Sequence, residues 1–409
     1  MARSEAGLPA GIRLTDHISL GVLTKTFPRP IVNQILEKSG KISQRERQMP
    51  AHVVVYYVIA LSLYREVSCR EVLRSLVEGL KWLFGRAEIK VTGKSGIAQA
   101  RKRLGADPIR QLYEEIVKPV ATKETRGAWY RKWKLVSIDG STLDVGDTPE
   151  NEAAFGRPGS KSGKSAFPQI RFVSLVENGT HVLYASQVGG SKEGEISLSQ
   201  GVMSQLKPGD LCLADRNFFG YSMWQLATGT GADQLWRVKK NLRLPCHKRF
   251  EDGSYLSKIY SRDKDRRRDR KGVWVRVIEY RLEGVAETEP LYRLITSILD
   301  PKKAPAEELA ALYHERWEIE TSFDELKTHL RGSKIVLRSK TPELVRQEFY
   351  GLLLAHFAIR GLMHEAALQE KLDPDELSFT HAVRVIKRKM TAFAAFSPSE
   401  SDTFSSSSS

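Results

Sequence analysis

The chain has 409 residues, of which 41% are hydrophobic, so it is long enough for two or three domains with buried cores. Its 64 Lys and Arg exceed its 49 Asp and Glu by 15, which favours a polyanionic partner, and nucleic acid before an anionic membrane surface. No apolar run reaches about 18 residues and no signal-peptide pattern opens the sequence, so neither a spanning helix nor secretion is expected. The three cysteines are far apart, which argues against a zinc or disulfide framework and predicts a reducing cytoplasm.

The first predicted elements are helices. Pro50–Ser68 starts with Pro and is apolar on nearly all sides, so it predicts a buried helix. Ser95–Gly105 predicts a short helix with a Ser cap and a Gly stop. Its basic cluster of Arg101, Lys102 and Arg103 fits a solvated surface and a DNA-backbone contact about equally.

Strand patterns follow. The apolar segment "LVSI" predicts a short strand that ends at Asp139, and two further strands flank the hairpin signal Asn178-Gly179. A helix fits Glu195–Leu206, and the strand "LCLA" ends at Asp215. The order is strand, strand, strand, helix, strand. If the strands before the two aspartates are neighbours, their carboxylates converge at the strand ends.

The remaining chain is first β-rich and then helical. Strand patterns recur from about Asp233 to Leu299, interrupted by the charged run Arg262–Lys271, which predicts a loop or hairpin tip. Helices are predicted after Pro305, and the low-complexity C-terminal tail predicts disorder.

One of these helices, "YHERWEIETSFDELKTHL", has two distinct faces. In an α-helix each residue is rotated by about 100° from the one before it, which places the apolar residues of this segment on one face and polar residues in a separate stripe. The apolar face predicts that the helix packs against the rest of the protein. The stripe holds Tyr313, Arg316, Glu320, Asp324 and Lys327. A solvated surface would explain it, because a helical pair such as Arg316–Glu320 contributes only about 0.2–0.5 kcal/mol.

A second explanation of the stripe uses the two strand-end aspartates. Glu320 would add a third carboxylate to Asp139 and Asp215, and such a set of oxygen ligands suits magnesium. Two ions about 3.5–4 Å apart would assist in-line phosphoryl transfer.

With these segments the sequence resembles the DDE transposases of bacterial insertion sequences, specifically the insertion-element-four family. "VSIDGSTLDVGDTPEN" resembles that family's first-Asp segment and "LADRNFFGY" its second. The spacing of Tyr313, Arg316, Glu320 and Lys327 matches its signature of Tyr, two residues, Arg, three residues, Glu, six residues and Lys. The resemblance covers nearly the whole chain.

The resemblance implies an α/β fold: a ribonuclease H-like catalytic core with a β-rich insertion, preceded by a mainly helical N-terminal domain. The expected boundaries are 1–125 for the N-terminal domain, which would bind DNA ends, 126–232 and 301–395 for the core, 233–300 for the insertion and 396–409 for a disordered tail.

The resemblance also implies cut-and-paste DNA transposition with Mg²⁺, for which Mn²⁺ can substitute. The catalytic and metal-binding residues would be Asp139, Asp215 and Glu320, and the DNA contacts would be Tyr313, Arg316, Lys327 and Arg216. The implied partners are double-stranded DNA, both the element's terminal inverted repeats and the target, and a second copy of the chain across paired DNA ends. No membrane is expected. The expected location is the bacterial cytoplasm, at the nucleoid when DNA is bound.

Relatives stack a flipped base on an aromatic ring of the insertion, for which Trp236, Trp274 and Tyr292 are candidates here. Strand core is the favoured interpretation of each, and Trp317 is expected to be a packing residue. Two alternatives remain for the function. A ribonuclease H-like nuclease would use the same carboxylates without joining strands, and a catalytically idle DNA-binding descendant of a transposase would not need them.

Overall fold

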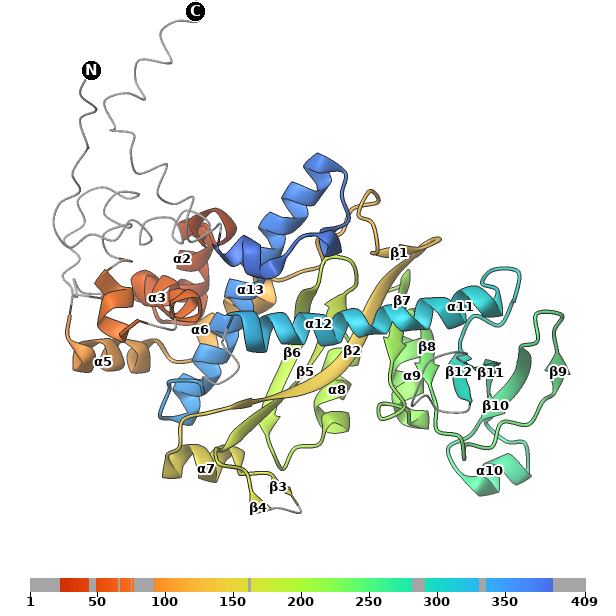
Figure 1. Ribbon diagram of the computed structural model, residues 1–409. Coiled ribbons are helices and arrows are strands. Elements are labelled where there is room, and N and C mark those ends of the chain that lie inside the picture. The colour runs from red at the N-terminus through yellow and green to blue at the C-terminus, as the bar shows by residue number, and fades with distance from the viewer. Residues whose placement is uncertain are drawn as a thin grey trace, which may run out of the picture. The chain divides into compact units, whose positions relative to one another are not determined.

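The computed structural model describes residues 23–43, 49–64, 67–74, 76, 92–160, 163–281, 291–330 and 336–384 (Figure 1). The chain divides into two compact units, each built from separate stretches of sequence. The first comprises Met1–Val117, Glu325–Met363 and Leu377–Ser409, and the second comprises Lys118–Asp324 and His364–Glu376. Within the described ranges, no helix is long and apolar enough to cross a membrane. The tail predicted to be disordered lies outside the described residues.

The first unit is helical in its described part. Its helices are α2 (Arg29–Lys38), α3 (Ala51–Leu63), α5 (Lys94–Leu104), α6 (Asp107–Ile116) and most of α13 (Pro342–Glu370). Pro50 caps α3, and every residue of α3 after His52 is buried, which confirms the predicted buried helix. Helix α13 approaches α3 closely, because a Cβ added at Gly351 would lie 2.8 Å from Val58 Cγ1.

Helix α5 differs from its prediction in two respects. Its N-cap is Gly93 and not Ser95, whereas it ends at Gly105, as predicted. Arg101 is only 7% exposed, and its Nε donates to Gln347 Oε1 at 2.8 Å. Arg101 therefore fits neither the predicted surface nor the predicted DNA contact, because its charge serves to join α5 to α13.

The second unit is built on one mixed sheet. Its strands are β1 (Trp129–Tyr130), β2 (Trp133–Asp144), β5 (Gln169–Glu177), β6 (Val182–Gly190), β7 (Asp210–Ala214), β8 (Asp233–Arg237), β9 (Lys248–Arg249), β10 (Tyr255–Ile259), β11 (Val273–Tyr280) and β12 (Tyr292–Thr296). The order is β6-β5-β2-β7-β8-β12-β11-β10-β9, and β1 pairs with β2. The β2–β7 and β7–β8 pairs are parallel, and the other pairs are antiparallel. The antiparallel strands β2, β5 and β6, the helix that follows them and β7, which is parallel to β2, form the ribonuclease H-like core that the resemblance implies.

The β-rich stretch after α9 (Tyr221–Gly229) does not form a separate sheet. Strand β12 pairs with β8, so the ladder of the core continues through β11 and β10 to β9. The charged run predicted as a loop or hairpin tip contains a short helix, α10 (Asp263–Arg267). The short strands β3 (Gly159–Ser160) and β4 (Gly163–Lys164) form a hairpin of their own.

Helices α7 (Pro149–Phe155), α8 (Glu195–Met203), α9 (Tyr221–Gly229) and α11 (Ala306–Leu312) complete this unit with α12 (Glu318–Asp324) and the 3₁₀ turn η4 (Pro374–Glu376). Figure 1 shows α12 crossing β2. On the same side, Leu135, Leu211 and Leu213 pack with Leu309 and Tyr313 in one buried cluster. Because side chains alternate along a strand, Asp139 and Asp215 continue this alternation and face the same side.

The segment Tyr313–Leu330 is not one regular α-helix. It begins as a 3₁₀ turn (Tyr313–Trp317), continues as α12 and ends in the π-helical turn Glu325–Leu330. A constant advance of about 100° per residue therefore does not hold along it, since 3₁₀ and π turns contain fewer and more residues than an α turn. The residues of the predicted polar stripe accordingly differ in exposure: Tyr313 and Arg316 are buried, whereas Glu320 and Asp324 are exposed.

Candidate active site

Two neighbouring strands carry the two aspartates. Strand β7 ends at Ala214, so Asp215 follows the strand directly, as predicted. The predicted end of the other strand at Asp139 is wrong, because the β2–β5 ladder continues to the Asp144–Gln169 pair. In the parallel β2–β7 register Ile138 lies opposite Ala214, which places Asp139 beside Asp215.

Arg316 joins these strands to α12. Its Nη1 lies 3.3 Å from Asp139 Oδ2 and its Nη2 lies 3.1 Å from Glu320 Oε1. Burial alone would lower the pKa of Arg316, but the Tyr313 hydroxyl and the three carboxylates nearby hold this pKa above its usual value. Those carboxylates belong to Asp139, Asp215 and Glu320. The structure therefore brings all three acids around one buried guanidinium.

The carboxyl of Asp139 is strongly perturbed. Burial is the main cause that raises its pKa to about 6, and the charges of Glu195 and Glu320 add to this effect. The Gly140 N–H, which donates to Asp139 Oδ1 at 2.7 Å, and Arg316 oppose it. Desolvated carboxylates that repel one another are stabilised by a cation. Because all the donors are oxygens, the site suits a hard divalent ion.

Glu195 is a fourth carboxylate that the sequence did not single out. It is the first residue of α8, and a Cβ added at Gly140 would lie only 2.9 Å from its Cδ. Glycine at position 140 thus lets this carboxylate approach the strand beside Asp139. The sequence placed Glu195 only at a helix start, and no local pattern relates it to a strand more than 50 residues earlier.

The proposed DNA contacts lie in different surroundings. Tyr313 is 5% exposed and its hydroxyl donates to Ala214 O at 3.3 Å, so it supports the end of β7 and has almost no surface for DNA. Arg216 is half-buried directly after Asp215, and Lys327 is half-buried in the π-helical turn. The prediction that Trp317 packs is wrong, because this residue is 57% exposed.

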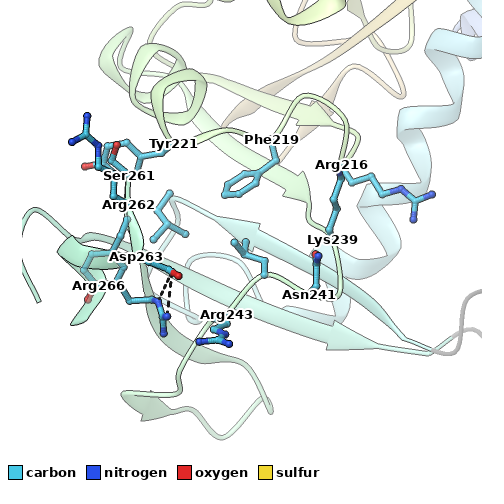
Figure 2. Close-up of a pocket in the computed structure, with 13 residues that line it drawn as sticks. Arg216, Phe219, Tyr221, Lys239, Asn241, Arg243, Ser261, Arg262, Asp263 and Arg266 are labelled. Atoms are coloured by element: carbon cyan, nitrogen blue, oxygen red, sulfur yellow. Dashed lines mark hydrogen bonds and ion pairs between the residues drawn. The ribbon is translucent and has the colours of Figure 1, made fainter. Parts of the chain in front are cut away.

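A basic pocket of about 490 Å³ lies between the segment after β7 and the insertion (Figure 2). Its cationic lining residues are Arg216, Lys239, Arg243, Arg262 and Arg266. Figure 2 shows the Phe219 ring turned into the pocket and Asp263 paired with Arg266, at 3.2 Å. The pocket combines positive charge with an aromatic face, which suits a nucleic-acid strand.

The three aromatic candidates of the insertion differ in exposure. Trp236 is fully buried against Trp224, with ring centroids 5.2 Å apart, which confirms the core interpretation. That interpretation is wrong for Trp274, which is 43% exposed with Lys258 Nζ 4.5 Å from its ring centroid. Tyr292 is half-buried and stacks on Tyr280.

Comparison with known proteins decides the family. Residues 132–358, more than half of the chain and including all three acids, match the family model described as Transposase DDE domain. The chain belongs to the DDE transposase family. Residues 17–114 of this transposase also match the model described as Insertion element 4 transposase N-terminal, which confirms the resemblance. The enzyme is therefore a DNA transposase, a polynucleotidyl transferase that depends on a divalent metal ion.

One relative of the transposase spans nearly the same length. It is the transposase InsG for insertion sequence element IS4 from Escherichia coli strain K12, 28% identical over 383 residues, which are 90% of this chain and 82% of the relative. Among solved structures, the piggyBac transposase synaptic complex with hairpin DNA is 12% identical, with a TM-score of 0.48 over 95% of this chain and 85% of that one.

Proposed function

We propose that this transposase moves its element by cutting both ends out of the donor DNA and joining them to a target, with Mg²⁺ or Mn²⁺ held by Asp139, Asp215 and Glu320. One observation carries the proposal: Arg316 contacts Asp139 of β2 and Glu320 of α12, and Asp215, beside Asp139 at the end of β7, interacts electrostatically with the same guanidinium. The cation, when bound, supplies a Lewis acid that activates the attacking oxygen and stabilises the leaving oxygen.

Neighbouring residues of the chain orient these acids. The Gly140 N–H orients Asp139 by donating to its Oδ1 at 2.7 Å. Arg316 holds Asp139 and Glu320 at a fixed separation, and Tyr313 holds the strand end that carries Asp215. We propose this supporting role for Tyr313 in place of the DNA contact that the resemblance implies. Glu195 would act beside Asp139 as a further ligand or as a fixed negative charge.

DNA would lie along the basic surface beside these acids. Arg216 follows Asp215 directly and lines the pocket of Figure 2, so it would bring a phosphate to the reacting centre. Lys327 remains a proposed second phosphate contact. The N-terminal residues 1–125 would recognise the terminal inverted repeats, and two copies of the chain would pair the two ends. Such an enzyme would work in the bacterial cytoplasm, at the nucleoid.

The decisive experiment incubates the purified transposase with labelled ends of its own element, a target plasmid and Mg²⁺. We expect end cleavage followed by strand joining, and neither in excess chelator. Asp139→Asn, Asp215→Asn and Glu320→Gln should each reduce cleavage by about 1,000-fold or more while DNA binding persists, because the ligand charge serves phosphoryl transfer and not docking.

A matched control is Asp144→Asn, which lies on β2 and pairs with Gln169 away from Arg316. It should cleave like the wild type. Near-normal cleavage by any of the three variants would remove that residue from the active site. Cleavage without joining under every condition would favour the ribonuclease H-like nuclease, which uses the same carboxylates.

A further inference from the structure

A second cluster of possible metal ligands lies at the start of α12, apart from the three acids near Arg316. It consists of His181, at the β5–β6 turn, Glu318, the first residue of α12, and Asp375 in η4. His181 Nε2 lies 2.9 Å from Asp375 Oδ1 and 3.8 Å from Glu318 Oε2, and one ligand atom from each residue lies within 4.8 Å of the others. None of the three acids at Arg316 belongs to this cluster.

The cluster is buried and one of its oxygens lacks a hydrogen bond. His181 is 3% exposed and Glu318 is 8% exposed. Glu318 Oε2 accepts from the Gly179 N–H, but Oε1 is buried without a hydrogen-bond partner. A buried acceptor without a hydrogen bond is destabilising, and more so when it is charged, because nothing replaces the water it has lost.

We propose that His181, Glu318 and Asp375 bind a divalent cation of the zinc class, separate from the catalytic ion. The ligand set points to this class, because an imidazole nitrogen with two carboxylates suits zinc, whereas magnesium and calcium prefer oxygen ligands alone. Three protein ligands leave a further position for water. The Asp375 side chain is 35% exposed, so the cation reaches its ligands from solvent at this residue.

The site would hold the catalytic helix on the sheet. Glu318 precedes Glu320 by two residues in α12. The β5–β6 turn already contacts this helix start, because Asn178 Nδ2 donates to Glu315 O at 2.8 Å and Gly179 donates to Glu318. A cation shared by the turn, α12 and η4 would add a third connection. Its role is therefore structural: it fixes the helix that carries Glu320 and does not contact the DNA.

The test measures zinc binding by the full-length protein and does not need transposition. The protein is stripped with chelator, dialysed, and titrated with Zn²⁺ in excess Mg²⁺, which would occupy the proposed oxygen-only catalytic site. We expect one zinc per chain and a rise in the unfolding temperature. Asp215→Asn should keep both, so a failure of the catalytic proposal leaves this result unchanged. His181→Ala and Asp375→Asn should weaken zinc binding by about 10-fold or more and abolish the thermal shift.

Two controls make the outcome decisive. His247→Ala removes an exposed histidine elsewhere and should bind zinc like the wild type. Asp375→Asn changes a partly exposed side chain and should keep the fold, which circular dichroism checks, so it tests the site even if His181→Ala unfolds. Failure of the wild type to bind zinc, or equal binding by wild type and Asp375→Asn, would overturn the proposal.

Discussion

At the scale of single residues, Arg316 shows how a modest helical pair can become part of the proposed active site. On an exposed helix, Arg316 and Glu320 would form an i, i+4 pair of about 0.3–0.5 kcal/mol. Here the Arg316 side chain is 10% exposed, and its Nη1 contacts Asp139, a residue 177 positions earlier in the sequence. Burial reduces solvent screening, so the guanidinium sets the spacing of two carboxylates from different elements.

Arg316→Ala should reduce end cleavage by about 100-fold or more, because Asp139 and Glu320 lose the positive charge that holds their carboxylates at a fixed separation. Arg316→Lys should remain impaired, since one ammonium cannot contact both carboxylates as the two Nη atoms do. Single-turnover cleavage of labelled ends measures both variants. Arg131→Ala is the control, because Arg131 pairs with Glu308 at an exposed site. Wild-type cleavage by both Arg316 variants would show that this guanidinium has no role in positioning the acids.

Glu195→Gln should raise the metal concentration needed for half-maximal cleavage, because it removes a negative charge beside Asp139. The comparison is Glu193→Gln, whose carboxylate instead accepts from the Gly190 N–H at 2.9 Å. Cleavage is followed across a Mg²⁺ titration. An identical titration for both variants would remove Glu195 from the metal-binding group.

At the scale of elements, the β5–β6 turn was predicted correctly from local sequence, but its contact with the segment around the start of α12 was not. Asn178-Gly179 predicted a hairpin, and the structure has one. Nothing local indicated that the same turn would contact the segment before α12, because Asn178 meets Glu315 only after the chain has folded. Gly179 also has φ +77° and packs against another backbone segment, since an added Cβ would lie 2.6 Å from Ala128 N.

Gly179→Ala should therefore destabilise the fold more than positive φ alone explains. Gly253 is a matched control with φ +80° and nothing within 4 Å of an added Cβ. We expect Gly253→Ala to cost about 1 kcal/mol and Gly179→Ala clearly more, because backbone atoms cannot move aside cheaply. Denaturant unfolding measures both. Equal losses would show that the close approach to Ala128 contributes nothing.

The sequence predicted elements with strong periodicity better than it predicted the surroundings of individual side chains. The buried helix α3, the order of core strands and the position of Asp215 after β7 follow from local pattern. The length of β2 was missed because its second half is paired with β5 and yet only partly apolar. Arg101 and Trp317 were misjudged because burial depends on what packs against a helix, which the helix itself does not encode.

At the scale of the whole molecule, the surplus of 15 positive charges acts through its distribution. Some arginines form ion pairs with neighbouring carboxylates, as Arg110 does with Asp107 and Glu114. The pocket of Figure 2 instead gathers five cationic residues around one acid, Asp263. DNA affinity should therefore depend on where a positive charge is removed and not only on how many are removed.

The double variant Arg243→Ala/Arg262→Ala should bind element-end DNA with a shallower salt dependence. Each lost phosphate contact reduces the log–log slope by about 0.9, so we expect a change of up to about 1.8. Arg110→Ala/Arg131→Ala changes the net charge equally at exposed arginines that already have carboxylate partners. Fluorescence anisotropy at several salt concentrations compares the two. The same slope for both double variants would mean that only the net charge matters.

The unbroken sheet from β6 to β9 has a mechanical consequence. An insertion joined by a hinge could swing freely, but β12 is hydrogen-bonded to β8, and β8 to β7. A load applied to the insertion by DNA in the basic pocket would therefore be transmitted across two ladders to β7, which directly precedes Asp215. The insertion is therefore expected to move together with β7 and with the proposed metal-binding acids beside it, and not independently of them.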